Sequence, residues 1–310
     1  MEFSLTTLGT GSAHPNPIRF SSAHAVKLRE HLFLIDCGEG CQINLCKAGL
    51  SIVKIEAIFI SHLHGDHCFG IFGLLSTMAL LGRTAPLKLF APPMMGKFLN
   101  FFQDYFSAGV KYEIEFTPLV EKEPLQLINH RTFTITAFPL DHQIETYGFL
   151  FKEKEPLRNV IKSKIAEQAL SLKEIAALKQ GKNLKRENGD LLMNSDYTYL
   201  PFNARSFAYC SDTAPFERLP QWIDGVDLLY HEATYADDNL ALAQLYHHST
   251  ARQAAEIATA AHASKLVLGH YSSRYKDLST LLDEARSVFE QTFLAKDGMV
   301  FDIPIVKNIG

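Results

Sequence analysis

The stretch Ala57-Ile58-Phe59-Ile60-Ser61-His62-Leu63-His64-Gly65-Asp66-His67 places three histidines and an aspartate directly after a hydrophobic strand. Such closely spaced side chains cannot all be buried in an apolar core, because each buried polar group needs a hydrogen-bonding or charged partner. Imidazole nitrogen and carboxylate oxygen are ligands that zinc takes in proteins. Gly65 permits a tight turn that lets these side chains converge. Unless the cluster is a chance feature of the surface, the stretch predicts a site for one or two zinc ions.

Further metal-competent side chains lie just past other predicted apolar strands. They are Asp141-His142 after residues 132–138, Asp212 after 206–209, and His270 after 265–268. Each of them alone would be an ordinary loop residue. Together with the histidine cluster they indicate one site, assembled from loops at an edge where sheet folds place their ligands.

The wider pattern predicts a layered α+β or α/β sandwich. Short apolar strands alternate with helical patterns, and strands outnumber helices in the first half, which does not fit a repeating βα barrel. Helices are predicted at 41–50, 69–81, 94–106, 249–261 and 278–289. We expect residues 1–310 to form one domain.

Composition excludes several classes of protein. With 47% hydrophobic and 21% charged residues the chain is not disordered, and its net charge of −4 argues against a protein that is positively charged all over to bind nucleic acid. No apolar run reaches the roughly 18 residues that a membrane span needs. The N-terminus does not read as a secretory signal, and the five cysteines include no C-x-x-C pair, so we expect a cytoplasmic protein with reduced thiols and no membrane partner.

One segment differs from the rest in charge. Residues 152–190 contain ten Lys/Arg and six Asp/Glu, a local net charge of +4 that leaves −8 for the remainder. Within it, 165–180 shows weak helical periodicity, and Asn188-Gly189 is a hairpin signal. Two interpretations are open, a solvated surface excursion or a basic arm-like insertion that binds a polyanion.

Three later motifs extend the pattern: His231-Glu232-Ala233-Thr234, His248-Ser249-Thr250 and His270-Tyr271-Ser272-Ser273-Arg274-Tyr275. The histidine cluster resembles the signature of the metallo-β-lactamase superfamily, whose fold is an αβ/βα four-layer sandwich. With the later motifs, nearly the whole chain resembles the ribonuclease Z family, zinc-dependent endoribonucleases that remove the 3′ trailer from precursor tRNA and leave a 3′-hydroxyl.

The resemblance implies a role for each matching residue. Two zinc ions per subunit are implied, although manganese would accept the same ligands. The first ion would be bound by His62, His64 and His142, and the second by Asp66, His67 and His270, with Asp212 bridging both. Asp36 would orient a ligand, although a turn-capping aspartate after a strand is the alternative. Asp66 also belongs to the expected catalytic set.

The family's chemistry needs a proton for the leaving oxygen. His248 is the expected acid, held in its cationic form by Glu232. The alternatives are a surface histidine at a helix start and a surface carboxylate. Arg274 would contact substrate phosphate or form a structural ion pair.

Two departures concern RNA binding. The family's Pro-x-Lys-x-Arg-Asn loop reads Pro15-Asn16-Pro17-Ile18-Arg19-Phe20 here, so only Arg19 is kept as a phosphate contact. The basic segment lacks the Gly-Pro motif of the family's tRNA-binding arm. A related binuclear zinc phosphodiesterase acting on other RNA or small diesters, and a non-catalytic RNA-binding protein, are the alternatives. Family resemblance also implies a homodimer.

Overall fold

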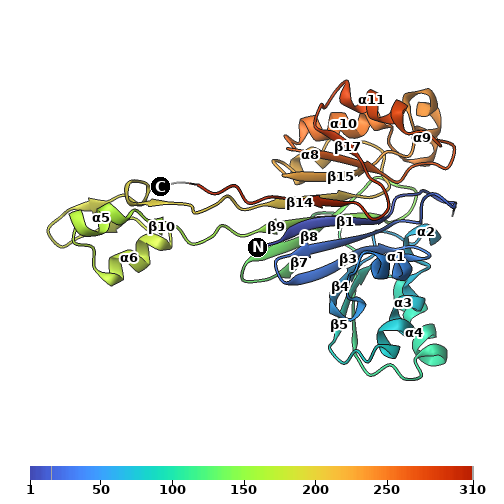
Figure 1. The fold of residues 1–310 in the computed structure, drawn as a ribbon, viewed down its shortest axis with the longest axis horizontal. Coiled ribbons are helices and arrows are strands. Elements are labelled where there is room, and N and C mark those ends of the chain that lie inside the picture. The colour runs from blue at the N-terminus through green and yellow to red at the C-terminus, as the bar shows by residue number, and fades with distance from the viewer. Residues whose placement is uncertain (15, 309–310) are drawn as a thin grey trace.

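The computed structural model describes residues 1–14 and 16–308, and Pro15, Ile309 and Gly310 lie outside the described residues. Two seven-stranded sheets form its centre (Figure 1). The first sheet has the order β18 (Val300–Asp302), β1 (Phe3–Gly9), β2 (Ala23–Leu28), β3 (His31–Cys37), β4 (Ile55–Phe59), β5 (Leu87–Ala91) and β6 (Ile114–Pro118). The second has the order β17 (Thr292–Leu294), β16 (Leu266–Gly269), β15 (Leu228–Glu232), β14 (Ser206–Cys210), β9 (Tyr147–Glu153), β8 (Phe133–Pro139) and β7 (Leu125–Asn129).

Helices cover the outer face of each sheet (Figure 1). The first sheet packs on α1 (Cys41–Lys47), α3 (Ile71–Leu80) and α4 (Met95–Phe106). The second packs on α8 (Leu219–Trp222), α10 (Ala251–Ala260) and α11 (Ser279–Arg286). The expected αβ/βα four-layer sandwich is therefore confirmed.

An aromatic core joins the two sheets. Phe59 of the first sheet lies 5.3 Å, ring centroid to ring centroid, from Phe149 of the second, and Phe33 lies 5.8 Å from Phe151. All four side chains are buried. Because a fully buried phenylalanine contributes about 1.5–3 kcal/mol relative to an exposed one, this core fixes how the loops of the two sheets face each other.

Parallel strand pairing brings the ligand-bearing loops to one edge. Strands β3, β4 and β5 are parallel neighbours in the first sheet, as are β14, β15 and β16 in the second. The loops that follow parallel strands leave a sheet at the same edge. The short helix α2 (Gly65–Cys68) and helix α9 (Leu240–Tyr246) lie in the connections after β4 and β15.

The chain between β9 and β14 projects from the sandwich as a small unit (Figure 1). It contains α5 (Lys162–Glu167), α6 (Leu172–Lys179), α7 (Asn194–Tyr197) and the strand pairs β10 (Asn159–Val160) with β13 (Thr198–Tyr199) and β11 (Leu184–Lys185) with β12 (Leu191–Leu192). It has its own buried cluster around Leu170, Leu178 and Leu192. We call residues 154–205 the arm.

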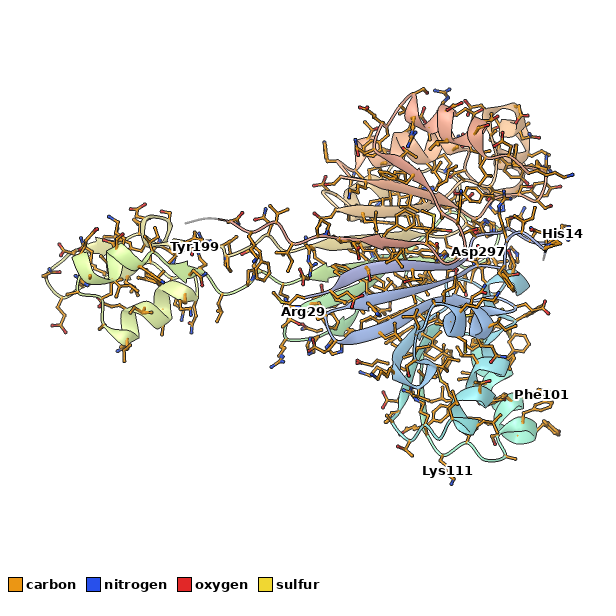
Figure 2. All side chains as sticks on the ribbon, viewed as in Figure 1. His14, Arg29, Phe101, Lys111, Tyr199 and Asp297 are labelled. Carbon is orange, nitrogen blue, oxygen red and sulfur yellow. The ribbon has the colours of Figure 1, made fainter. Side chains whose placement is uncertain are left out.

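The arm differs from the sequence prediction in two respects. The helix predicted at 165–180 is two helices, because Ala169 adopts a left-handed φ of 46° and Ser171 starts α6 with a capping box to Glu174. The unit also extends past Asp190 to Tyr199, labelled in Figure 2, because β13 returns to pair with β10. No helix among the described residues is long and apolar enough to cross a membrane.

Candidate metal centre

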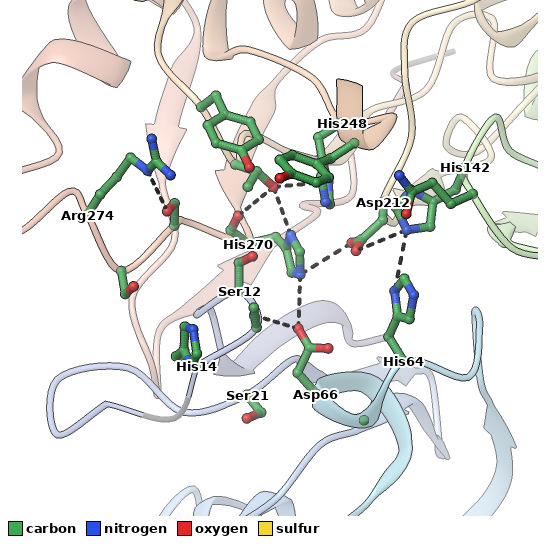
Figure 3. Close-up of a pocket in the computed structure, with 18 of the residues that line it drawn as sticks. Ser12, His14, Ser21, His64, Asp66, His142, Asp212, His248, His270 and Arg274 are labelled. Atoms are coloured by element: carbon green, nitrogen blue, oxygen red, sulfur yellow. Dashed lines mark hydrogen bonds and ion pairs between the residues drawn. The ribbon is translucent and has the colours of Figure 1, made fainter. Parts of the chain in front are cut away.

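Loops from both sheets meet at a cavity of about 930 Å³. His64 and Asp66 reach it from the first sheet, while His142, Asp212 and His270 reach it from the second (Figure 3). Five of the seven predicted ligands therefore line one cavity. The other two, His62 and His67, are fully buried directly behind it.

One group of possible ligand atoms comes from His62, His64, His142 and Asp212, all within 4.8 Å of one another. His62 Nε2 lies 3.0 Å from His64 Nδ1, and His142 Nε2 lies 3.4 Å from the same atom. Nδ1 of His142 donates to the backbone carbonyl of His247 at 2.8 Å, which leaves Nε2 free to face the centre.

A second group comes from Asp66, His67 and His270. Nε2 of His67 lies 3.1 Å from Nε2 of His270, and Asp66 Oδ2 lies 3.4 Å from Nε2 of His270. The backbone N–H of Ala13 donates to Asp66 Oδ2 at 2.7 Å, so the N-terminal loop helps to orient this carboxylate.

Asp212 lies between the two groups. Its Oδ2 is 3.5 Å from His62 Nε2, and its Oδ1 is 3.3 Å from His270 Nε2 and 3.5 Å from His67 Nε2. Oδ1 is buried and accepts no hydrogen bond from the described residues. An unpaired buried carboxylate oxygen is costly, and a cation between the two groups would remove that cost.

The electrostatics of the site also fit a metal. Burial by itself lowers the pKa of His67, but the carboxylates of Asp212, Asp66 and Asp36 raise it to about 10. That much negative charge around one imidazole favours a cation at this point. Nitrogen and carboxylate ligands without thiolate suit zinc, and they also suit manganese. The residues present therefore fit a pair of divalent metal ions.

Asp36 reaches His67 through a break in β3. In the pairing of β2 with β3, Ala23 lies opposite Cys37 and His24 lies opposite Ile35, so Asp36 is an extra residue, with a left-handed φ of 57°. Such a bulge re-aims a side chain at the cost of local strain. Asp36 Oδ2 accepts the hydrogen bond of His67 Nδ1 at 2.8 Å, which is not the geometry of a turn-capping aspartate.

His248 and Glu232 form a pair beside the metal ligands. Nδ1 of His248 lies 2.7 Å from Glu232 Oε1, and the carboxylate of Glu232 is fully buried. Burial alone lowers the pKa of His248, but the charge and hydrogen bond of Glu232 raise it to about 9. His248 lines the cavity, as Figure 3 shows, so a cationic donor faces the place where substrate would lie.

The two arginines that were expected to contact substrate phosphate lie in different surroundings. Arg274 lines the cavity rim, where its guanidinium lies 5.2 Å from the centroid of the Tyr235 ring and donates to Asn239 Oδ1 at 2.9 Å. Arg19 is buried and donates to the backbone carbonyl of Tyr275 at 2.9 Å. In this arrangement Arg19 supports the loop after β16 rather than the cavity wall.

Several supporting residues were not assigned a role from sequence. Glu232 accepts hydrogen bonds from the backbone N–H groups of Thr213 (3.0 Å), Thr234 (2.9 Å) and Ser249 (3.1 Å). These donors keep a buried carboxylate ionised. Thr234 and Ser249 belong to motifs quoted above, but a backbone donor leaves no side-chain signature in the sequence.

Comparison with known proteins extends this picture. Residues 3–157 match the family described as "Anti-Pycsar protein Apyc1". The chain is 41% identical over 302 residues to ribonuclease Z of Bacteroides thetaiotaomicron, covering 97% of this chain and 96% of the relative. It is 43% identical over 302 residues to ribonuclease Z of Cytophaga hutchinsonii, again with 97% and 96% covered.

Solved structures agree. The short form of human tRNase Z superposes with a TM-score of 0.71 at 26% identity, covering 97% of this chain and 99% of that one. The metallo-β-lactamase fold protein YhfI of Bacillus subtilis superposes with a TM-score of 0.67 at 18% identity, covering 97% and 100%. The chain therefore belongs, by its first half, to the family described for Apyc1 and, over nearly its full length, to the ribonuclease Z family.

Proposed function

We propose that the protein is a metal-dependent endoribonuclease that removes the 3′ trailer from precursor tRNA. The observation that carries this function is the meeting of two ligand groups at Asp212, beside the His248–Glu232 pair, in a chain of the ribonuclease Z family. We also propose that the protein acts in the cytoplasm.

His62, His64 and His142 would bind one metal ion, and Asp66, His67 and His270 the other, with Asp212 shared. Two divalent ions, when bound by these residues, would supply a nucleophile at neutral pH and would stabilise the negative charge that develops on a phosphate. We propose zinc for both positions, because the ligands are imidazole and carboxylate.

His248 would donate the proton that the leaving oxygen needs. Nδ1 of His248 is bonded to Glu232, and among the described residues no hydrogen bond is made by Nε2, so Nε2 is the nitrogen that would donate. Protonating the 3′-oxygen of the tRNA leaves a 3′-hydroxyl on the tRNA and a 5′-phosphate on the trailer. Glu232 positions His248 and stabilises its charge.

The surroundings of the cavity favour RNA as the substrate. Phe69 and Tyr246 line it with 72% and 45% of their surfaces exposed, and exposed aromatic rings beside a phosphodiester site can stack on nucleobases. Arg274 at the rim could contact a phosphate.

The arm offers a second contact for tRNA. Residues 154–205 contain ten Lys/Arg and six Asp/Glu, and Lys162, Lys173, Lys182 and Lys185 are exposed. Phosphate contacts need charge more than sequence, so the missing Gly-Pro motif does not remove this role. We propose residues 1–310 as one domain with this arm as its RNA-binding insertion.

We also propose a homodimer formed through the outer face of α4. Phe98, Phe101, Tyr105 and Phe106 are exposed there, and Leu80 of α3 is 88% exposed. Figure 2 shows Phe101 pointing away from the sandwich. An apolar patch of this kind marks an interface, and a second copy would let the arm of one subunit hold a tRNA that the other subunit cuts.

Cleavage assays test the function. Zinc-loaded protein is incubated with a precursor tRNA that carries a short 3′ trailer, and with bis(p-nitrophenyl) phosphate. We expect cleavage next to the discriminator base. Hydrolysis of the small diester without tRNA cleavage would instead support a phosphodiesterase acting on other substrates. No activity on either compound with both metal ions bound would contradict an enzymatic function.

A further inference from the structure

Tyr209 is a buried residue behind the metal centre that the proposed mechanism does not use. It lies on β14, in the layer between the two sheets, with 1% of its surface exposed. Its hydroxyl donates to Asp36 Oδ2 at 2.8 Å and lies 3.3 Å from Ser22 Oγ. Burial and the charge of Asp36 raise the pKa of Tyr209 well above its ordinary value, so the phenol stays protonated and donates.

Asp36 is held by several donors on its two oxygens. Oδ1 accepts the backbone N–H of Ser61 at 2.8 Å. Oδ2 accepts from Ser61 Oγ at 3.0 Å, from His67 Nδ1 at 2.8 Å and from Tyr209 at 2.8 Å. A buried carboxylate with this many donors has one orientation, and that orientation sets the ring of His67.

Tyr209 is also the donor that reaches Asp36 from the other sheet. Asp36 and His67 belong to the first half of the sandwich, whereas Tyr209 precedes Asp212 by three residues on the second. The hydrogen bond therefore connects Asp36, whose carboxylate orients His67, to β14, the strand that precedes Asp212.

We propose that Tyr209 is a positioning residue for the metal centre, fixing Asp36, and through it His67, in register with Asp212. This inference rests on the proposed metal-dependent function. It assigns Tyr209 a role beyond packing, since the hydroxyl, and not the ring, makes the contact that matters.

The structure supplies a matched control in Tyr230. The rings of Tyr209 and Tyr230 are stacked with centroids 5.1 Å apart, and His24 packs against both, at 5.1 and 4.4 Å. Tyr230 is equally buried, but its hydroxyl has no hydrogen-bond partner among the described residues. Tyr230→Phe therefore removes the same atom from the same stack without touching Asp36.

The test compares zinc binding by the wild-type protein, Tyr209→Phe and Tyr230→Phe in competition with a chromophoric zinc chelator. Removing a hydrogen bond that supports a ligand costs about 10–100-fold in metal affinity. We therefore expect Tyr209→Phe to lower the affinity for one of the two zinc ions by about 10-fold. Tyr230→Phe should bind both ions as the wild type does. Equal affinities in all three proteins, or equal losses in both variants, would overturn the proposal.

A second measurement shows whether Tyr209 acts through Asp36. In an Asp36→Asn background, Tyr209→Phe should cause little further loss of zinc affinity, whereas additive losses would contradict the proposed route. No RNA is present in either experiment, so a wrong substrate assignment leaves the result intact. A wild-type protein that binds no zinc would overturn the metal centre and this inference together.

Discussion

His247 and His248 are adjacent in the sequence, but their side chains have different surroundings. The His248 side chain is 12% exposed and paired with buried Glu232, whereas His247 is 45% exposed and lies 3.1 Å from Asp141 at the surface. The proposed general acid must be charged and must face the cavity, and His248, which lines the cavity and has a raised pKa, meets both conditions.

His248→Ala should therefore keep its zinc and lose about 10²–10⁴-fold in kcat on precursor tRNA. The loss on bis(p-nitrophenyl) phosphate should be much smaller, because p-nitrophenolate leaves without being protonated. Zinc content and kcat on both substrates are measured. His247→Asn, which tolerates the left-handed φ of 54° at that position, is the control. Loss of zinc from His248→Ala would show that this residue is a ligand.

Glu232→Gln should move the alkaline limb of the pH–rate profile. The cationic form of His248 is present below its pKa and is lost as pH rises through that value. Because Glu232 raises the pKa of His248, removing its charge should make kcat on precursor tRNA decline at lower pH than in the wild type. Single-turnover rates as a function of pH measure the shift, and an unchanged alkaline limb would refute the pairing.

At the scale of elements, a cluster of charged residues, Glu153, Arg205 and Arg29, lies where the arm joins the sandwich. Glu153, the last residue of β9, has a side chain with no exposed surface and is bonded to Arg205 Nε at 2.9 Å and Arg29 Nε at 3.2 Å. Arg205 also donates to the carbonyl of Ile303 at 2.6 Å, so this charged cluster connects the arm to the C-terminal segment. Arg29 marks this end of the sandwich in Figure 2.

Glu153→Ala should destabilise the protein by about 3–5 kcal/mol, because it leaves two arginines next to an empty buried site. Burial raises the pKa of Glu153, but the hydrogen bonds and charge of Arg205 lower it overall. The stabilisation is therefore complete above the ordinary pKa of a glutamate and is lost as pH falls through the lowered value. Denaturant unfolding at neutral and acidic pH should show the wild type and the variant converging in acid.

The exposed lysines of the arm should affect the binding of RNA but not the hydrolysis of a small phosphodiester. Replacing Lys162, Lys173, Lys182 and Lys185 with glutamine should raise KM for precursor tRNA. It should also make log KM depend less steeply on log salt concentration, by about one unit of slope for each phosphate that a lysine no longer neutralises. Hydrolysis of bis(p-nitrophenyl) phosphate should not change, since the arm projects from the sandwich, away from the cavity. An unaltered KM for tRNA would mean that the arm is only a surface excursion.

At the scale of the whole molecule, the proposed dimer depends on the exposed aromatic side chains on the outer face of α4. Phe101→Glu places a charge in the centre of the exposed aromatic face, and we expect it to convert a dimer into a monomer in sedimentation analysis. Lys111→Glu, an exposed charge change beyond the end of α4, should leave the mass unchanged. A wild-type protein that sediments as a monomer would contradict the proposed interface.

The long apolar strands and strongly periodic helices were predictable because their signals are local. The strands predicted at 132–138, 206–209 and 265–268 correspond to β8, β14 and β16, and the helix predicted at 94–106 corresponds to α4. The edge strands β7, β17 and β18 were missed. β17 and β18 have three residues each, and β7 is largely exposed, so pairing with a neighbour forms these strands more than their own composition does.

By itself, the sequence determined the kind of site, because ligand type and spacing are local properties of the chain. It indicated metal-binding side chains after several strands, but the tight turn expected at Gly65 is in fact the start of the short helix α2, which carries Asp66 and His67. Only the tertiary structure decided how these side chains group. The aromatic core between the sheets fixes the distance across which Asp212 meets His62 and His67, and the bulge at Asp36 directs its carboxylate to His67. The tertiary structure also directs the Arg19 side chain inward, to the backbone carbonyl of Tyr275. Contacts between such distant segments follow from packing, and the local spacing of residues in the sequence does not indicate them.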